Sequence, residues 1–349
     1  MLLYINKIKK EKVLTSYNFA KSCNLVYAEA LTPIQFEKCR NINQRIYYQS
    51  DRMIIYKNTE YTVKEGDIIF CHTDFLPNLF SDFKKLAQFS NLILLTNQTD
   101  TMIGEKLFKK IPKCFSKWYS INVDLENDKL VSLPLGLSND YSPKNLKSTD
   151  YLEVENDIKA KGVSMYINFR NTNFNERELL YSKFENVDWV TSDIPNIEMS
   201  EYLKKLSNHS FVLAPWGNGV DTHRIWETLY AGSIPITKYH PTFSDFRDLP
   251  IFFVENYDEI THERLNNFLL SLKADKFYSE KLNIDFWINS MRNLPSDNEF
   301  VITIKERKWI NYYYDNVRII NNKYHSYMKK IIFQFRKIKK IKRLFSQNS

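Results

Sequence analysis

Residues 215–236 read Pro215-Trp-Gly-Asn-Gly-Val-Asp-Thr-His-Arg-Ile-Trp-Glu-Thr-Leu-Tyr-Ala-Gly-Ser-Ile-Pro-Ile236, and they hold three of the seven glycines of the chain. A glycine-poor chain uses glycine where the backbone needs a positive φ or where another group approaches closely. An apolar run, Phe211–Ala214, precedes this stretch, and a second one begins at Ile234. The pattern predicts a strand, a glycine turn, a helix and a strand. Such a unit can hold an anionic ligand at the N-terminus of its helix.

The predicted helix begins at Asp221 or Thr222, because either side chain can serve as its N-cap. Its packing positions and its left-handed C-terminal residue are expected at Ile225, Trp226, Leu229, Tyr230 and Gly232. His223, Arg224 and Glu227 are three or four residues apart, so they can share one helical face. An ordinary capped surface helix with an Arg–Glu pair would account for each of these residues equally well.

The sequence from Gly217 to Glu227, followed by Gly232–Ile236, resembles the signature of exostosin-like glycosyltransferases. It is most similar to the bacterial and viral relatives that assemble surface polysaccharides. Three further stretches fit the same family, namely Thr73–Leu76, Leu133–Asn139 and Asn168–Arg177. The resemblance runs from about residue 65 to about residue 260 and is strongest over 211–238. One position departs from the family, since Trp216 replaces an arginine and offers a ring that could stack on a base or a sugar.

Strands alternate with helices along the chain, which predicts a doubly wound α/β fold. The expected strands are 67–71, 91–96, 164–169, 187–191, 211–214, 234–237 and 250–254, and the expected helices include 200–208, 258–272 and about 300–326. The resemblance implies more, namely two Rossmann-like domains of GT-B type that face a cleft. We therefore expect an acceptor-side domain at 1–150, a nucleotide-sugar domain at 151–275, helices packing back on the body at 276–327, and a basic tail at 328–349.

The resemblance implies that the second domain binds a nucleoside-diphosphate sugar, a UDP- or GDP-sugar. Glu227 would accept hydrogen bonds from the ribose, and Arg224 with Arg177 or Arg170 would meet the diphosphate. The expected donor-binding residues are Arg170, Asn173, Arg177, Trp216, Gly217, Asn218, Gly219, Asp221, Arg224 and Glu227. Guanidinium groups and backbone N–H donors can stabilise a leaving diphosphate without a metal. No Asp-x-Asp motif follows a strand, so we expect neither a metal nor a cofactor.

Three residues are candidates for the general base that an inverting transfer requires. Asp74 and Asp100 each follow a predicted buried strand, and His223 begins the predicted helix. Each has a simpler explanation, because an aspartate commonly caps a helix and the histidine could orient the turn. A retaining enzyme would need none of them as a base. The sequence leaves the choice open.

The net charge of +8 is concentrated at the C-terminus. The chain has 49 basic and 41 acidic residues, and residues 328–349 contain eight basic residues and no acidic one. The rest of the chain is therefore formally neutral, which argues against nucleic-acid binding. Ile331, Phe335, Ile338 and Phe345 recur near one helical face of this tail. A basic amphipathic helix of this kind suits the anionic inner face of a membrane, although a solvated basic tail would have the same composition.

These observations lead to one hypothesis and two alternatives. No stretch reaches the roughly eighteen apolar residues of a membrane span, and the N-terminus has no long apolar region. We expect a cytoplasmic enzyme, peripheral at the inner face of the cytoplasmic membrane. It would transfer a sugar from a nucleotide-sugar donor to a growing surface polysaccharide, such as a capsule, or to a lipid-linked glycan. The alternatives are a sugar-nucleotide epimerase or hydrolase of the same fold, and a non-catalytic glycan- or nucleotide-binding protein.

Overall fold

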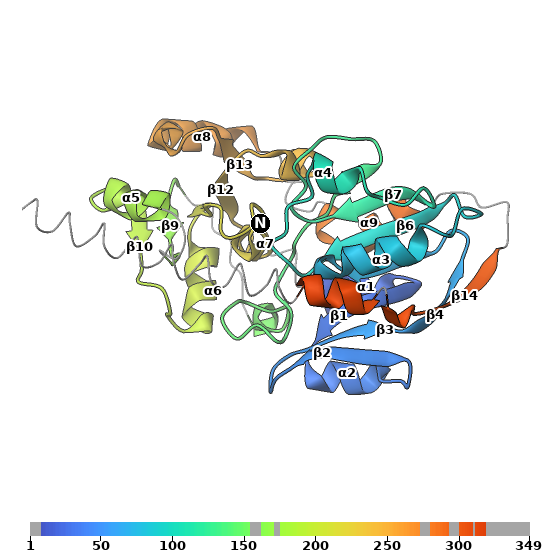
Figure 1. Ribbon diagram of the computed structural model, residues 1–349. Coiled ribbons are helices and arrows are strands. Elements are labelled where there is room, and N and C mark those ends of the chain that lie inside the picture. The colour runs from blue at the N-terminus through green and yellow to red at the C-terminus, as the bar shows by residue number, and fades with distance from the viewer. Residues whose placement is uncertain are drawn as a thin grey trace, which may run out of the picture.

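The computed structural model describes residues 8–153, 162–170, 175–272, 280–292, 300–309 and 311–318. The chain forms two α/β domains, each built on its own sheet, with helix α7 between them (Figure 1). This arrangement confirms the predicted class of two Rossmann-like domains facing a cleft. The two sheets lie at 25–132 and 165–254, within the first and second predicted domains. The predicted basic tail, 328–349, lies outside the described residues.

The first domain contains a seven-stranded sheet in the order β2-β3-β1-β5-β6-β7-β8. Its strands are β1 (Leu25–Leu31), β2 (Gln44–Gln49), β3 (Ile54–Asn58), β5 (Ile68–His72), β6 (Leu92–Asn97), β7 (Phe115–Ser120) and β8 (Leu130–Ser132). Strands β1 and β5–β8 run parallel, and β2 and β3 add an antiparallel edge. Every residue of β5 and β6 is buried, as expected for central parallel strands that are covered on both faces.

Helices cover both faces of this sheet. They are α1 (Ser16–Ser22), α2 (Pro33–Cys39), α3 (Leu76–Phe83), α4 (Glu105–Phe108) and α9 (Ile284–Arg292). Ile69 and Cys71 of β5 pack in the same core as α3, whereas Ile68 and Phe70 pack in the core that contains α1 and α9. The alternation follows from the period of two along a strand, which sends neighbouring side chains to opposite faces.

The second domain has a five-stranded parallel sheet in the order β10-β9-β11-β12-β13. Its strands are β9 (Met165–Ile167), β10 (Val190–Ser192), β11 (Phe211–Leu213), β12 (Ile234–Lys238) and β13 (Phe252–Val254), and its helices are α5 (Asn175–Phe184), α6 (Met199–Asn208), α7 (His223–Tyr230) and α8 (His262–Ser271). Short 3₁₀ turns lie at Lys10–Lys12, Thr73–Phe75, Asp150–Glu153, Pro241–Phe246, Tyr257–Glu259 and Glu280–Leu282. The strand order reverses between β9 and β11, and ligands of open α/β sheets bind at such a switch point.

The C-terminal segment differs from the prediction of one helix over about 300–326. Residues Val301–Lys305 form strand β14, which pairs antiparallel with β4 (Glu60–Lys64), and among the described residues of this range 308–309 and 311–318 are helical. Alternating β-branched residues in Val301-Ile-Thr-Ile explain the strand. Three aromatic residues of this segment, Trp309, Tyr312 and Tyr313, are exposed.

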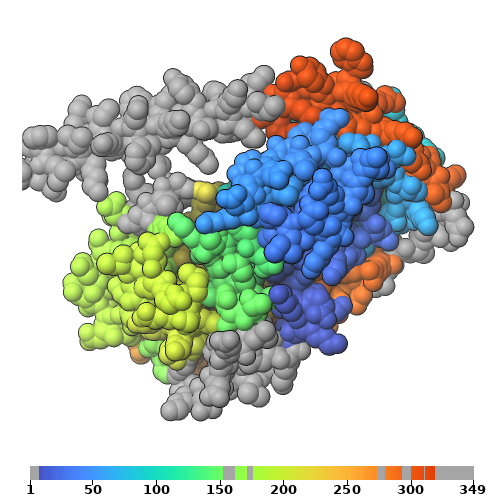
Figure 2. Space-filling model, turned by 90° about the horizontal axis from the view of Figure 1, so that it is seen from below, coloured from blue at the N-terminus to red at the C-terminus, as the bar shows by residue number. Residues whose placement is uncertain are grey.

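The segment after β8 crosses between the two domains (green in Figure 2). The backbone conformation of Gly136 determines the direction of this segment. Gly136 has a φ of +71°, and an added Cβ would lie 2.2 Å from the carbonyl oxygen of Leu14. The next residue, Leu137, donates its N–H to that same carbonyl over 2.8 Å. The N-terminal segment and the crossing segment therefore meet at a point where only glycine fits.

We predict that Gly136→Ala lowers the free energy of unfolding by about 2 kcal/mol or more, because it adds both a clash and a strained backbone. Gly162→Ala is the matched control, since nothing lies within 4 Å of its added Cβ. Urea unfolding followed by circular dichroism measures both variants. Equal midpoints for Gly136→Ala and the wild type would contradict this account of the crossing.

Candidate active site

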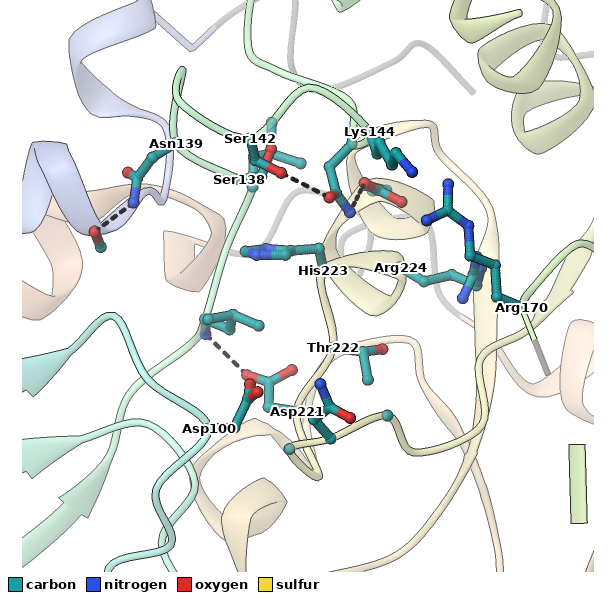
Figure 3. Close-up of a pocket in the computed structure, with 18 of the residues that line it drawn as sticks. Asp100, Ser138, Asn139, Ser142, Lys144, Arg170, Asp221, Thr222, His223 and Arg224 are labelled. Atoms are coloured by element: carbon teal, nitrogen blue, oxygen red, sulfur yellow. Dashed lines mark hydrogen bonds between the residues drawn. The ribbon is translucent and has the colours of Figure 1, made fainter. Parts of the chain in front are cut away.

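A cavity of about 550 Å³ lies between the domains, at the carboxyl ends of strands from both sheets (Figure 3). Asn97–Asp100 reach it from the end of β6. Asn168 and Arg170 follow β9, and Gly217 to Arg224 follow β11. The second domain therefore presents its switch point to the cavity, which is the position where open α/β sheets bind ligands.

Helix α7 starts at this cavity. Thr222, in an extended conformation, is its N-cap, and Thr222, His223 and Arg224 all line the cavity. The predicted packing positions are correct, because Ile225, Trp226, Leu229 and Tyr230 are buried and Gly232 has a φ of +75°. The first turn of a helix carries free N–H groups and a partial positive charge, so this end of α7 favours an anion.

His223 has one ring nitrogen fixed by the protein. Its Nδ1 lies 2.8 Å from the carbonyl oxygen of Gly136. A carbonyl oxygen can only accept, so Nδ1 carries the proton of the neutral ring and Nε2 keeps its lone pair. Figure 3 shows the ring lying within the cavity. In the neutral ring, Nε2 is thus the nitrogen that can accept a proton from a bound molecule.

The two aspartates proposed as bases lie in different places. Asp100 is exposed and lines the cavity. Asp74 is not among the lining residues, which corrects the prediction that it projects into the cleft. Its turn packs instead against the terminal residues of the described chain, where the guanidinium of Arg318 lies 4.1 Å from the ring centroid of Phe75. The structure therefore leaves His223 and Asp100 at the cavity.

Four cationic side chains line the cavity, namely Lys144, Arg170, Arg177 and Arg224, and Figure 3 shows Lys144, Arg170 and Arg224 along the same side. Arg224 lies beside Tyr202 and Glu227, which raise its pKa although burial acts to lower it. Its Nε is buried without a hydrogen-bond partner among the described residues. Arg170 donates to Asn196 over 2.7 Å. Lys144, which also lines the cavity, was not among the residues predicted from the sequence.

Arg177 forms hydrogen bonds to the backbone of the glycine loop. Its Nε donates to the carbonyl of Trp216, and its two terminal nitrogens donate to the carbonyls of Pro215 and Arg170, all within 3.1 Å. Burial and the nearby Arg224 lower the pKa of Arg177 to about 10, so it stays protonated at neutral pH. Three of its five N–H donors are thus used by the backbone of its own domain.

The glycines of the loop serve close packing rather than a positive φ. An added Cβ would lie 2.9 Å from Nδ2 of Asn122 at Gly219, and 3.3 Å from a methyl group of Thr222 at Gly217. The N–H of Gly217 donates to the carbonyl of Gly219 over 2.9 Å. This corrects the expectation that the backbone of Gly217 meets a diphosphate, since that donor is already bonded. Asn218, exposed at the turn, lines the cavity.

One further expected donor-binding residue, Trp216, does not line the cavity in the structure. Trp216 is absent from the lining, because its indole N–H donates to the carbonyl of Lys238 over 3.2 Å and its ring packs on His240 at 5.3 Å. The stacking role expected of Trp216 is therefore corrected. Asn173 lies outside the described residues.

Asp221 and Glu227 are both buried, and each connects α7 to another part of the chain. Asp221 accepts the N–H of Leu135 and the indole N–H of Trp226, both at 2.8 Å. Burial raises its pKa to about 7, against the effect of these hydrogen bonds. Glu227 accepts the N–H of Leu146 at 3.2 Å and the hydroxyl of Tyr202 at 3.1 Å. The sequence alone predicts neither the contact between Asp221 and Leu135 nor the contact between Glu227 and Leu146.

Backbone strain in the described part of the chain gathers at this site. Only three residues other than glycine have a positive φ there, namely Gln98 (76°), Asn122 (52°) and Asn196 (86°). Gln98 and Asn196 line the cavity, and Asn122 accepts the N–H groups of Val220 and Asp221. Such conformations cost on the order of 1–3 kcal/mol each, and proteins concentrate them at functional sites.

The described residues contain no group of three or more His, Cys, Asp or Glu side chains placed to hold a metal ion. The same residues contain no helix that is long and apolar enough to cross a membrane.

Comparison with known proteins gives a likeness of fold. No protein-family model matches the chain, and no curated protein sequence matches it. The crystal structure of an α1,3-fucosyltransferase with GDP-fucose is 15% identical, with a TM-score of 0.34 over 69% of this chain and 80% of that one. A second α1,3-fucosyltransferase crystal structure is 18% identical, with a TM-score of 0.31 over 61% and 72%. The resemblance to exostosin-like glycosyltransferases stays a prediction.

The raised pKa of Asp221 predicts a pH-dependent stability. Between the ordinary aspartate pKa of 3.8 and about 7, the folded chain keeps a proton that the unfolded chain has released. The contribution of Asp221 to the free energy of unfolding therefore falls as pH rises through this window, by at most about 1.4 kcal/mol per pH unit.

Asp221→Asn removes the titrating group, so the stability of the wild type relative to this variant should decline as pH rises to about 7 and then level off. Urea unfolding of both proteins across this range measures the difference. Parallel stability curves would show that Asp221 does not titrate as its burial implies.

Proposed function

We propose that the protein uses this cavity to transfer a sugar from a nucleoside-diphosphate donor to a hydroxyl group of a glycan or lipid-linked acceptor. The observation that carries this proposal is the gathering of Lys144, Arg170 and Arg224 beside the start of α7, with Nε2 of His223 in the same cavity. Cations and a helix N-terminus suit a diphosphate, and an unprotonated ring nitrogen suits proton removal from a hydroxyl.

The cations stabilise the leaving group in this scheme. As the bond between the anomeric carbon and the diphosphate breaks, its electron pair stays on the departing phosphate oxygen. Fixed guanidinium and ammonium groups lower the energy of that developing charge. We propose that they do so in place of a divalent metal ion. Glu227 accepts from Tyr202, Leu146 and Asn145, and a carboxylate has about four acceptor positions, which leaves about one for a ribose hydroxyl.

His223 acts as the general base in this proposal. The acceptor oxygen forms a bond to the anomeric carbon while Nε2 of His223 takes the hydroxyl proton. The carbonyl of Gly136 then stabilises the imidazolium through the Nδ1–H bond. Asp100 is the competing base, because its carboxylate also lines the cavity.

We further propose that the protein works at the inner face of the cytoplasmic membrane on a surface polysaccharide. Residues 328–349 support this location through their eight basic residues and absence of acidic ones. Each basic residue near an anionic surface contributes roughly 1 kcal/mol of attraction.

We predict that His223→Asn lowers the rate of transfer by about 10²- to 10⁴-fold, with little change in donor affinity. The Asn amide can still donate to the carbonyl of Gly136, but it offers no proton acceptor in place of Nε2. Release of nucleoside diphosphate in the presence of acceptor measures the rate, and calorimetry measures donor binding. If Asp100→Asn shows the large loss and His223→Asn does not, the aspartate is the base.

We predict that Arg224→Gln lowers donor turnover by about 10²- to 10³-fold, as expected for loss of one charge-stabilising group. Arg264→Gln is the matched control. Arg264, on α8, forms a surface ion pair with Glu259 and does not line the cavity. Unfolding midpoints check that both variants fold. Wild-type activity should persist in excess EDTA, and its loss would reject the metal-independent scheme.

A further inference from the structure

The terminal helix, formed by residues 308–309 and 311–318, turns a polar face toward the protein. Asn311 accepts from Nδ2 of Asn78 on α3 over 2.7 Å, and Asp315 accepts from the hydroxyl of Tyr47 over 3.1 Å. The guanidinium of Arg318 lies 4.4 Å from the ring centroid of Tyr47. The residues at 311, 315 and 318 thus anchor the helix against the first domain (red in Figure 1).

A buried lysine prevents this helix from rotating. Lys57, which is fully buried, donates from Nζ to Oδ1 of Asn311 over 2.8 Å and pairs with Glu306 over 3.0 Å. Turning the helix would remove the Asn311 contact and leave a buried ammonium with fewer partners, which is strongly unfavourable. The polar face is therefore fixed inward, and the opposite face is fixed outward.

The outward face is aromatic. Trp309, Tyr312 and Tyr313 are 88%, 67% and 63% exposed, and their spacing of three and four residues places them on one side of a helix. A surface helix ordinarily buries its aromatic side and exposes its polar side. This helix does the reverse, on the outer rim of the first domain (Figure 2). An exposed aromatic cluster of this kind marks an interaction surface.

We propose that Trp309, Tyr312 and Tyr313 insert into the headgroup region of an anionic lipid bilayer. Trp and Tyr favour that region, because one end of each ring system is apolar and the other is polar. Arg307 and Lys308, both exposed, precede the cluster, and the eight basic residues of 328–349 follow it. The charges suit anionic lipids and disfavour a second copy of this chain, whose tail carries the same sign.

This surface is distinct from the proposed active site, so an experiment can contradict one of the two proposals without contradicting the other. Attraction between the basic tail and lipids weakens as salt rises, since the Debye length falls to about 3 Å near 1 M. Burial of aromatic rings depends far less on salt. Binding that persists at high salt therefore reports on the aromatic face, whereas donor turnover in solution reports on the cavity.

The test compares three full-length proteins by flotation with vesicles of equal parts phosphatidylcholine and phosphatidylserine. Trp309→Gln, Tyr312→Gln and Tyr313→Gln are combined in one variant. The matched control combines Ile42→Gln, Ile194→Gln and Leu270→Gln, which replace side chains that are 97%, 84% and 78% exposed elsewhere. We expect the aromatic variant to lose about tenfold or more of its vesicle affinity at high salt, while the control binds like the wild type.

Donor turnover and the unfolding midpoint should be unchanged in both variants. Wild-type flotation of the aromatic variant would overturn the proposal, as would an equal loss in the control. Analytical ultracentrifugation supplies a third outcome. If the wild type is a dimer that the aromatic variant cannot form, and flotation is unchanged, the face is an interface between copies and the lipid proposal is wrong.

Discussion

The buried carboxylate of Asp221 is one of the contacts that join the two domains. It belongs to the second domain, yet one of its oxygens accepts the N–H of Leu135 from the segment that leaves the first sheet. Its other oxygen accepts the indole N–H of Trp226 and so fixes the start of α7. At the far end of α7, the hydroxyl of Tyr230 accepts from Leu14 and donates to the carbonyl of Leu282. Both ends of this helix are therefore bonded to segments outside the second sheet, and the side chains on its first turn are held at the cavity.

The sequence predicted those parts of the fold whose signals are local. Strands β5 and β6 appear as unbroken apolar runs because both of their faces are buried. The start of α7 was predicted within a residue, because an N-cap and the spacing of its packing residues lie in one short stretch. Strand β14 was missed because a strand only five residues long acquires its partner, β4, from more than two hundred residues earlier in the chain.

The candidate site could be predicted only in part. Residues that look alike in the sequence have different neighbours in the structure. The glycine loop was located correctly, but its N–H groups at Val220 and Asp221 are bonded to Asn122, which is about a hundred residues away. The sequence alone does not distinguish the surroundings of Trp216 from those of Trp309. One lies against His240 and the other is exposed, and only the partners in three dimensions separate them. Lys144 reaches the cavity because the segment after β8 crosses α7, where Glu227 accepts the N–H of Leu146.

The same backbone that joins the domains also sets the protonation of the proposed base. Gly136 adopts a positive φ because the chain passes close to Leu14, and this conformation directs its carbonyl to Nδ1 of His223. The carbonyl fixes the tautomer, so Nε2 is presented unprotonated without any help from a carboxylate. A change in the position of the first domain would move Gly136 and Leu135 together, since they are neighbours in the chain. The contact that joins the domains at Asp221 and the contact that orients the ring of His223 therefore lie in one short segment of the chain.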